Sequence, residues 1–191
     1  MTFIQNTRHE KIMSNKNSVF IATSLDGYIA DKNGRIDWLH SIPNPNKDDM
    51  GYVDFTNGID ALVMGRKTFE TVLGFDVAWP YNKPVFVLSN TLNEIPKSHK
   101  GKVFLVKGTL TEVLKQINEK GFHKLYIDGG TTIRNFLKED LIDEMKITTI
   151  PILLGGGSPL FTDLPKKLKF ELIESKTFLN QVTQNHYKRK R

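Results

Sequence analysis

The sequence predicts a three-layer α/β domain with a mostly parallel central sheet and an antiparallel hairpin at one edge. Short apolar runs, such as residues 84–88 and 103–106, are continuous rather than alternating, which is typical of strands covered on both faces. These runs alternate with segments of helical periodicity, which is the order expected of parallel strands joined by helices. The last two strand-like segments follow one another with no helix between them, so we expect them to pair as the hairpin.

The first half of the chain predicts three strands and two helices. A strand is expected at residues 19–22, and the Asp26-Gly27 turn follows it. Turn residues dominate the loop 31–47, and a helix is expected over 48–57 because acidic residues favour a helix N-terminus. The other elements of this half are a strand at 60–64, a helix at 69–73 and a strand at 84–88.

The second half predicts two further helices and five strands. One helix begins at Thr109 or Thr111 and ends near Lys120, because the apolar residues between them recur on one helical face. The other helix covers 131–137, directly after a glycine pair. The strands are expected at 103–106, 124–127, 144–154, 170–176 and 181–188.

The composition excludes several classes of site. The chain has 191 residues and no cysteine, so it holds no disulfide, no thiolate nucleophile and no cysteine-based metal site. The longest apolar runs, such as 150–154, are far too short to span a bilayer, so we expect no membrane role. The lack of cysteine and of a secretory h-region favours the cytoplasm.

The net charge of +6 lies at the two ends of the chain. The last four residues, 188–191, are all basic, and the first seventeen carry two more positive charges than negative ones, which leaves 18–187 neutral. Nucleic-acid binders spread basic residues over a folded face, so we expect no nucleic-acid partner. We divide the chain into a disordered leader (1–17), one domain (18–188) and a solvated basic tail (189–191), with Met13 as an alternative start.

Two strand-to-helix turns contain glycine followed by polar residues. Gly65 is followed by Arg66, Lys67 and Thr68, and Gly129-Gly130 is followed by Thr131 and Thr132. A helix N-terminus presents free N–H groups to an anion, and glycine lets a phosphate approach closely. The alternative is that each glycine simply makes a turn.

Other polar residues follow neighbouring strands of the predicted sheet. Ser89 and Asn90 end one strand and Lys107 ends the next. Because ligands gather at the carboxyl ends of parallel strands, these loops and the two glycine turns predict one phosphate-binding edge.

Several familiar motifs are missing. The chain has no G-x-G-x-x-G after its first strand and no P-loop, and no G-x-S-x-G for a hydrolase. Its five histidines are scattered without a metal-ligand spacing, so we expect no metal site.

Three segments resemble a known superfamily. The run 64–70, MGRKTFE, resembles a segment of dihydrofolate reductases. The runs 22–30, ATSLDGYIA, and 150–161, IPILLGGGSPLF, resemble still more closely the reductase domain of bacterial riboflavin biosynthesis and its stand-alone relatives. The resemblance covers about 18–188 and implies a dihydrofolate-reductase-like fold that binds NADPH and a small-molecule substrate, commonly as a homodimer paired through its late strands.

The resemblance also implies roles for individual residues. Arg66, Lys67 and Thr68, with Gly65, match the segment that holds the adenosine-side phosphates. Ser89 and Asn90 match the strand end beside the adenosine 2′-phosphate, and Lys107 matches a position that flanks the adenine. Gly129, Gly130, Thr131 and Thr132 match the turn against the diphosphate. Ala22 and Ile29 match positions near the nicotinamide. Basic side chains near a 2′-phosphate favour NADPH over NADH.

On the substrate side, the resemblance points to Asp49 and Thr148 as catalytic. Asp49 matches the substrate-binding carboxylate of dihydrofolate reductases by its spacing from Gly65; alternatively it is an exposed helix-start acid, and Asp54 is a rival. Thr148 matches a strand hydroxyl facing the pocket, or it is an ordinary strand residue. Trp38 and Phe55 are expected in the core or the pocket wall.

These observations predict an NADPH-dependent reductase of a small heterocyclic or ribosylaminopyrimidine-type substrate. The riboflavin branch reduces a ribosylaminopyrimidine phosphate at the ribose, but the chain shows no cysteine-containing deaminase motif, which leaves the substrate open. The alternatives are a true dihydrofolate reductase, with Asp49 buried among apolar side chains, and a protein that binds NADPH without catalysis or acts as an adaptor through its basic tail.

Overall fold

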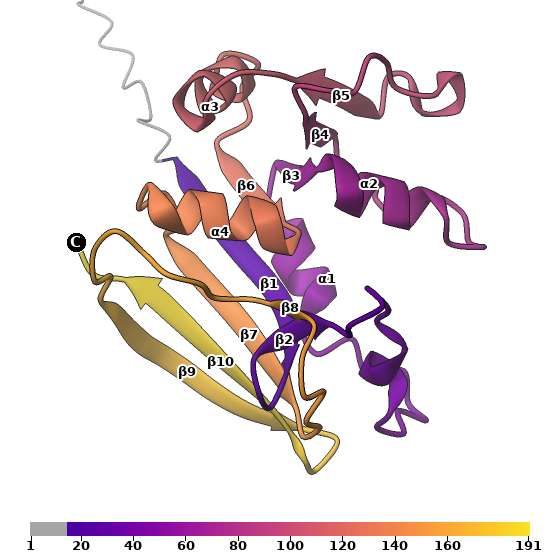
Figure 1. Cartoon of the computed structure of the whole chain (residues 1–191), viewed down its shortest axis with the longest axis vertical. Coiled ribbons are helices and arrows are strands. Elements are labelled where there is room, and N and C mark those ends of the chain that lie inside the picture. The colour runs from indigo at the N-terminus through magenta and orange to yellow at the C-terminus, as the bar shows by residue number, and fades with distance from the viewer. Residues whose placement is uncertain (1–14) are drawn as a thin grey trace, which may run out of the picture.

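The computed structural model describes residues 15–191, and its main sheet contains eight strands. They are β1 (Lys16–Ser24), β3 (Ala61–Gly65), β4 (Val85–Leu88), β5 (Val103–Val106), β6 (Lys124–Asp128), β7 (Glu144–Ile150), β9 (Phe170–Phe178) and β10 (Val182–Arg189). The order across the sheet is β5–β4–β3–β6–β1–β7–β10–β9 (Figure 1). The strands from β5 to β7 are parallel, and the β9–β10 hairpin pairs antiparallel with β7. The predicted parallel sheet with an edge hairpin is therefore confirmed.

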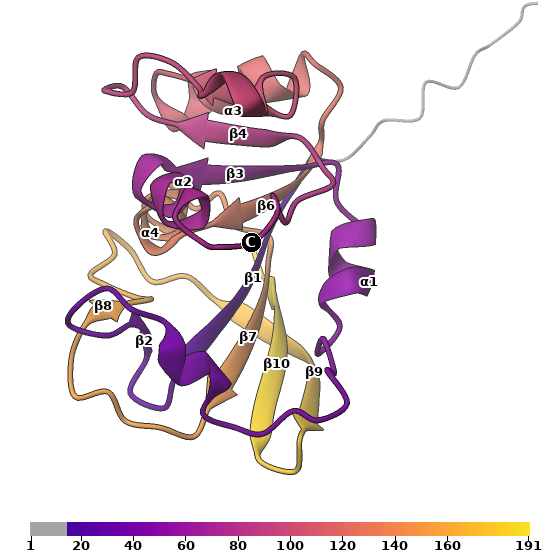
Figure 2. The same cartoon turned by 90° about the vertical axis from the view of Figure 1, so that its right-hand side faces the viewer.

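Helices cover both faces of the sheet, which gives the three predicted layers. They are α1 (Tyr52–Asn57), α2 (Arg66–Leu73), α3 (Leu110–Asn118) and α4 (Gly130–Lys138), with short 3-10 turns η1 (Asp37–His40) and η2 (Lys97–His99). On one face, α3 and α4 bury Val113, Ile133 and Phe136 against the sheet. On the other, α1 and α2 contribute Phe55 and Phe69 to a second core. The β9–β10 hairpin extends the sheet away from α3 (Figure 2).

Local chemistry sets the start of α3. Thr109 accepts a hydrogen bond from the Glu112 N–H, and the Glu112 side chain accepts one from the Thr109 N–H, so the two residues form a capping box. Of the two caps that the sequence allowed, the structure selects Thr109.

Two predicted boundaries were wrong. The helix expected from Asp48 begins at Tyr52, because Lys47 and Met50 adopt positive φ and the Asp48 and Asp49 side chains bind loop N–H groups instead. The strand expected over 144–154 ends at Ile150, just before a proline.

The chain beyond β7 returns to form a small second sheet that the sequence did not predict. This sheet pairs β2 (Tyr28–Ala30) with β8 (Ser158–Pro159). Gly157, with φ of 138°, makes the close approach possible, because a Cβ there would lie 2.1 Å from the Ala30 carbonyl oxygen.

The two ends of the described chain differ from the expectation. Lys16 and Asn17, assigned to the leader, belong to β1; the other leader residues up to 14 lie outside the described residues. The tail is only partly solvated, because Lys190 and Arg191 are exposed while Arg189 is enclosed. Arg189 lies in β10 with its side chain 7% exposed, and its Nε and Nη2 donate to the two Asp140 oxygens at 2.7 and 2.9 Å. Arg191 donates to Asp143 at 2.6 Å. Paired carboxylates therefore fix the basic tail to the loop before β7.

No helix in residues 15–191 has the length and apolar content needed to cross a membrane.

Replacing Arg189 by methionine tests this anchor. The Arg189 hydrogen bonds hold the pKa of Asp140 at about 2, so the pair stabilises the fold above the unfolded carboxyl pKa near 4 and this contribution is lost as the pH falls toward 2. Urea unfolding should show Arg189→Met less stable by about 2 kcal/mol at pH 7, with the gap closing between pH 4 and 2. Lys188→Met, at an exposed neighbour, is the control; a gap that persists at pH 2 would contradict the assignment.

Candidate functional site at the carboxyl edge of the sheet

The loops singled out in the sequence meet at one edge of the sheet. Because β3, β4, β5 and β6 are adjacent and parallel, their carboxyl ends lie side by side. We call this edge the rim. It consists of residues 65–68, 89–91, 107–108 and 128–132.

The two glycine turns of the rim pack into one another. An added Cβ on Gly129, which has φ of 85°, would lie 2.1 Å from the Thr68 hydroxyl oxygen. In return, a Cβ on Gly65 would lie 3.0 Å from the Thr132 hydroxyl oxygen. Each glycine therefore makes room for the threonine of the other turn. The sequence suggested that these glycines let a phosphate approach closely. The structure shows that their missing side chains leave space for a threonine of the neighbouring turn.

The outer part of the rim is basic and internally bonded. The Arg66 guanidinium donates to Glu70 at 2.8 Å and to the Thr91 hydroxyl at 3.2 Å, so it spans from α2 to the loop after β4. Asn90 accepts from the Gly108 N–H at 3.1 Å, which ties the loops after β4 and β5 together. Ser89 is buried and its hydroxyl accepts the Leu92 N–H, whereas Lys67 and Lys107 are exposed.

β2 lies over the inner part of the rim. The Ile29 side chain and the Arg134 guanidinium lie within 3 Å of where a Gly130 Cβ would be. Arg134 also donates to the Pro159 carbonyl and to the Thr131 hydroxyl, so it connects β8 to the first turn of α4. Ile29 is thus brought to the rim, while Ala22 pairs with Thr148 within the sheet.

Asp128 is a site residue that the sequence reasoning missed. It ends β6 directly before Gly129, whose N–H donates to it at 2.8 Å. Strand alternation directs it to the α1 face, on the same side as Tyr126. Burial raises the pKa of Asp128 to about 6. The sequence contained a signal, a carboxyl group between a buried strand and a glycine pair, but it was interpreted only as a turn.

Asp49 is exposed, not partly buried as the substrate-binding role required. Its two oxygens accept the Gly51 and Val53 N–H groups at 2.9 and 2.8 Å, and these backbone hydrogen bonds lower its pKa. Asp49 is therefore the ionised cap of a loop. Its rival Asp54 is also exposed, on α1.

Thr148 is buried in the sheet beneath that loop. Its hydroxyl accepts from the Gln184 amide at 2.9 Å, and the same amide donates to the Met50 carbonyl at 3.1 Å. Gln184, also buried, was not singled out in the sequence. Trp38 packs in a small core with Ile150 and Val182, whereas Phe55 lies among aromatic rings against β1 and β6.

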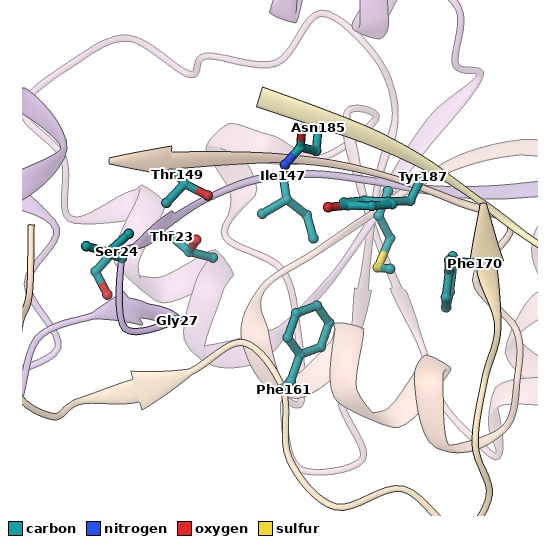
Figure 3. A pocket seen from close by; sticks show the side chains of 11 residues that line it. Thr23, Ser24, Gly27, Ile147, Thr149, Phe161, Phe170, Asn185 and Tyr187 are labelled. Carbon is teal, nitrogen blue, oxygen red and sulfur yellow. The ribbon is translucent and has the colours of Figure 1, made fainter. Parts of the chain in front are cut away.

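A hollow of about 340 Å³ lies on the opposite face of the sheet, away from the predicted site residues. Figure 3 shows Ile147 and Tyr187 of the sheet facing Phe161 of the loop after β8. No charged side chain lines the hollow, and its polar lining consists of hydroxyl and amide groups. Among residues 15–191, no three histidine, aspartate or glutamate side chains gather as a set of metal ligands.

Comparison with known proteins identifies relatives over almost the whole chain. The model of the RibD C-terminal domain matches residues 18–184. The uncharacterized protein YwjB of Bacillus subtilis is 36% identical over 178 residues, which is 93% of this chain and 99% of that protein. A crystal structure of a putative riboflavin biosynthesis protein from Shewanella sp. PV-4 is 61% identical with a TM-score of 0.90, and the match covers 92% of this chain and 99% of that one.

The wider fold is that of dihydrofolate reductases. The structure of dihydrofolate reductase from Enterococcus faecalis, complexed with NADP(H), matches with a TM-score of 0.64 at 18% identity, covering 92% of this chain and 97% of that one. The dihydrofolate-reductase-like fold implied by the sequence is confirmed.

Replacing Gly129 by alanine tests the packing of the two turns. We expect Gly129→Ala to lose about 4 kcal/mol in urea unfolding, because positive φ and contact with Thr68 each cost about 1–3 kcal/mol. Adding Thr68→Ala should recover about half, since only the contact is relieved. Gly65→Ala is the matched control and should cost less, because its φ of −79° is ordinary. Equal losses at the two glycines would refute this account.

Proposed function

This chain belongs to the RibD C-terminal domain family, and we propose that it is a reductase that uses NADPH to reduce a small heterocyclic or ribosylaminopyrimidine-type substrate. The observation that carries the proposal is the rim itself, where two glycine turns, two helix N-termini and three basic side chains share one sheet edge. Such an edge suits a dinucleotide with several phosphates.

The proposed cofactor site follows the rim from β5 to β1. We assign Arg66, Lys67 and Lys107, with Ser89 and Asn90, to the adenosine side, where Arg66 already reaches the loop after β4. Gly65 and Thr68, together with 129–132, would face the diphosphate. Ala22 and Ile29 would lie near the nicotinamide. The NADP(H) complex of the enterococcal reductase supports nicotinamide cofactor binding in this fold.

We assign the proton of the reaction to Asp128. When bound, NADPH supplies the hydride. Reduction of a C=N or C=O bond also needs a proton on the heteroatom. A carboxyl group with a pKa of about 6 is protonated in roughly a tenth of the molecules at pH 7, far more than a carboxyl group of ordinary pKa. Asp128 would donate that proton and regain one from water.

The alternatives have less support. A dihydrofolate reductase of the expected kind would bury Asp49, which is exposed. We retain Thr148, which Gln184 holds in place, on the substrate side and assign Asp49 no catalytic role. The hypothesis of an adaptor with a free basic tail has less support, because Arg189 donates hydrogen bonds to Asp140 and Arg191 donates to Asp143.

Arg66→Ala tests the cofactor assignment. In calorimetric titrations the variant should bind NADPH about tenfold more weakly and NADH nearly as before, because a charge-assisted contact to the 2′-phosphate contributes on the order of 1.5–3 kcal/mol. Lys102→Ala is the control, because Lys102 is an exposed cation directly before β5, at the end of that strand opposite to the rim. Equal losses for both cofactors would refute the 2′-phosphate role, and no heat from NADPH with the unaltered protein would refute the proposed function.

We also propose that two copies pair through their late strands. Within residues 15–191 no strand pairs with the outer edge of β9, and Phe161, Leu172 and Ile173 are each at least half exposed beside the hollow and the hairpin. Light scattering should give twice the mass of the 21.8 kDa chain, and Leu172→Glu with Ile173→Lys should shift the mass toward the monomer. A monomer at all concentrations of the unaltered chain would overturn this proposal.

A further inference from the structure

Trp38 is a buried residue whose indole N–H is unpaired. The residue is 8% exposed, its Nε1 is enclosed, and no atom among residues 15–191 accepts a hydrogen bond from it. A buried tryptophan N–H normally has a partner, because an unpaired buried donor loses its hydrogen bonds to water and gains none in return. An acceptor on a bound molecule would satisfy this group.

Trp38 covers the sheet directly beside the proposed substrate side. It packs with Ile150 and Val182, where β7 ends and β10 begins. Ile150 follows Thr148 by two residues on β7, so both side chains point to one face, about 7 Å apart along the strand. Thr148 pairs with Ala22, which the proposed function places near the nicotinamide. Because the cofactor is assigned to the rim from β5 to β1, a ligand that reaches Trp38 is the substrate.

Thr148 offers a second donor on the same face. The Gln184 side-chain nitrogen lies 3.1 Å from the Met50 carbonyl oxygen, which can only accept, so this end of the amide is the donor. The same nitrogen lies 2.9 Å from the Thr148 hydroxyl, whose oxygen therefore accepts and whose hydrogen is left for another acceptor. Two donors on one face match a ligand edge that carries carbonyl oxygens.

The loop 37–51 controls access to Trp38. Figure 2 shows the chain between β2 and α1 crossing the carboxyl end of β7 and the start of β10, in agreement with the packing of Trp38. Among residues 15–191, the bond from Gln184 to the Met50 carbonyl is the one hydrogen bond that joins this loop to the sheet, and apolar packing supplies the other contacts. A loop held in this way can open for a ligand and close over it.

We infer that Trp38 determines substrate specificity by donating its indole N–H to a ring carbonyl oxygen, and this inference rests on the proposed function. The substrate is then a heterocycle with a lactam edge, and Thr148 donates to the same edge. A ring with amino groups in place of the carbonyls is disfavoured, because it sets donors against the donors of the protein.

Lumazine and 2,4-diaminopteridine test the inference, because they share one ring system and differ in carrying two carbonyl or two amino groups. Calorimetry on protein saturated with NADP⁺ should show lumazine binding about tenfold more tightly. In Trp38→Phe this preference should fall to about threefold or less, because one of the two donors is removed. The variant should still bind NADP⁺ as the unaltered protein does.

The indole resonance of Trp38 gives a second readout on the unaltered protein. In proton–nitrogen correlation spectra with NADP⁺ present, lumazine should move this resonance downfield, whereas NADP⁺ alone should leave it in place. Trp79 provides the control, because it is the other tryptophan, its N–H is also enclosed and unpaired within residues 15–191, and it packs in a different core beside Phe69 and His99. Trp79→Phe identifies the two signals and should retain the preference for lumazine.

The outcomes separate this inference from the proposed function. Equal or tighter binding of 2,4-diaminopteridine overturns the inference, as does lumazine binding that leaves the Trp38 resonance in place. A shift of that resonance by NADP⁺ alone also overturns it, because the acceptor would then lie on the cofactor. Binding of NADP⁺ without either pteridine overturns the inference and leaves the cofactor assignment intact. Failure of both NADP⁺ and NADPH to bind overturns the proposed function itself.

Discussion

The site depends on the mutual packing of two glycine turns. Where β3 and β6 end, Thr68 fills the space that a side chain on Gly129 would need, and Thr132 does the same above Gly65. This contact fixes the N-termini of α2 and α4 next to one another, so their free N–H groups face one region of space. The rim follows from this contact, because α2 carries Arg66 toward the loop after β4 and α4 carries Arg134 toward β8.

Charge is unevenly distributed along the rim. The basic side chains follow the outer strands β3 and β5, where they suit the charged end of a dinucleotide. Asp128 ends the inner strand β6 and shares its face with Tyr52 and Tyr126. Burial favours its protonated form, and aromatic surface favours a flat ring beside it. The rim therefore has its basic side chains on the outer strands and a carboxyl group of raised pKa on an inner strand.

The expectations that were confirmed rest on local sequence signals. Those that were wrong depend on how distant parts of the chain meet in the folded structure. Apolar runs and glycines predicted the strands, the helices and the glycine turns that open α2 and α4, because these signals are local. The exposure of Asp49 was not predictable, since it depends on whether a loop bends at Lys47 and Met50. Nor was the anchoring of Arg189, because Asp140 lies 49 residues away and meets it only through the hairpin pairing with β7.

By itself, the sequence determined the α/β class, the two glycine turns and the family, because the signal for each lies in short contiguous runs of residues. Only the tertiary structure decided that the glycines serve the facing threonines, that Asp128 rather than Asp49 is the enclosed carboxyl, and that Gln184 holds Thr148. The physical reason is that burial and hydrogen bonding depend on which strands become neighbours. In a sheet ordered β3–β6–β1–β7–β10, those neighbours are far apart along the chain.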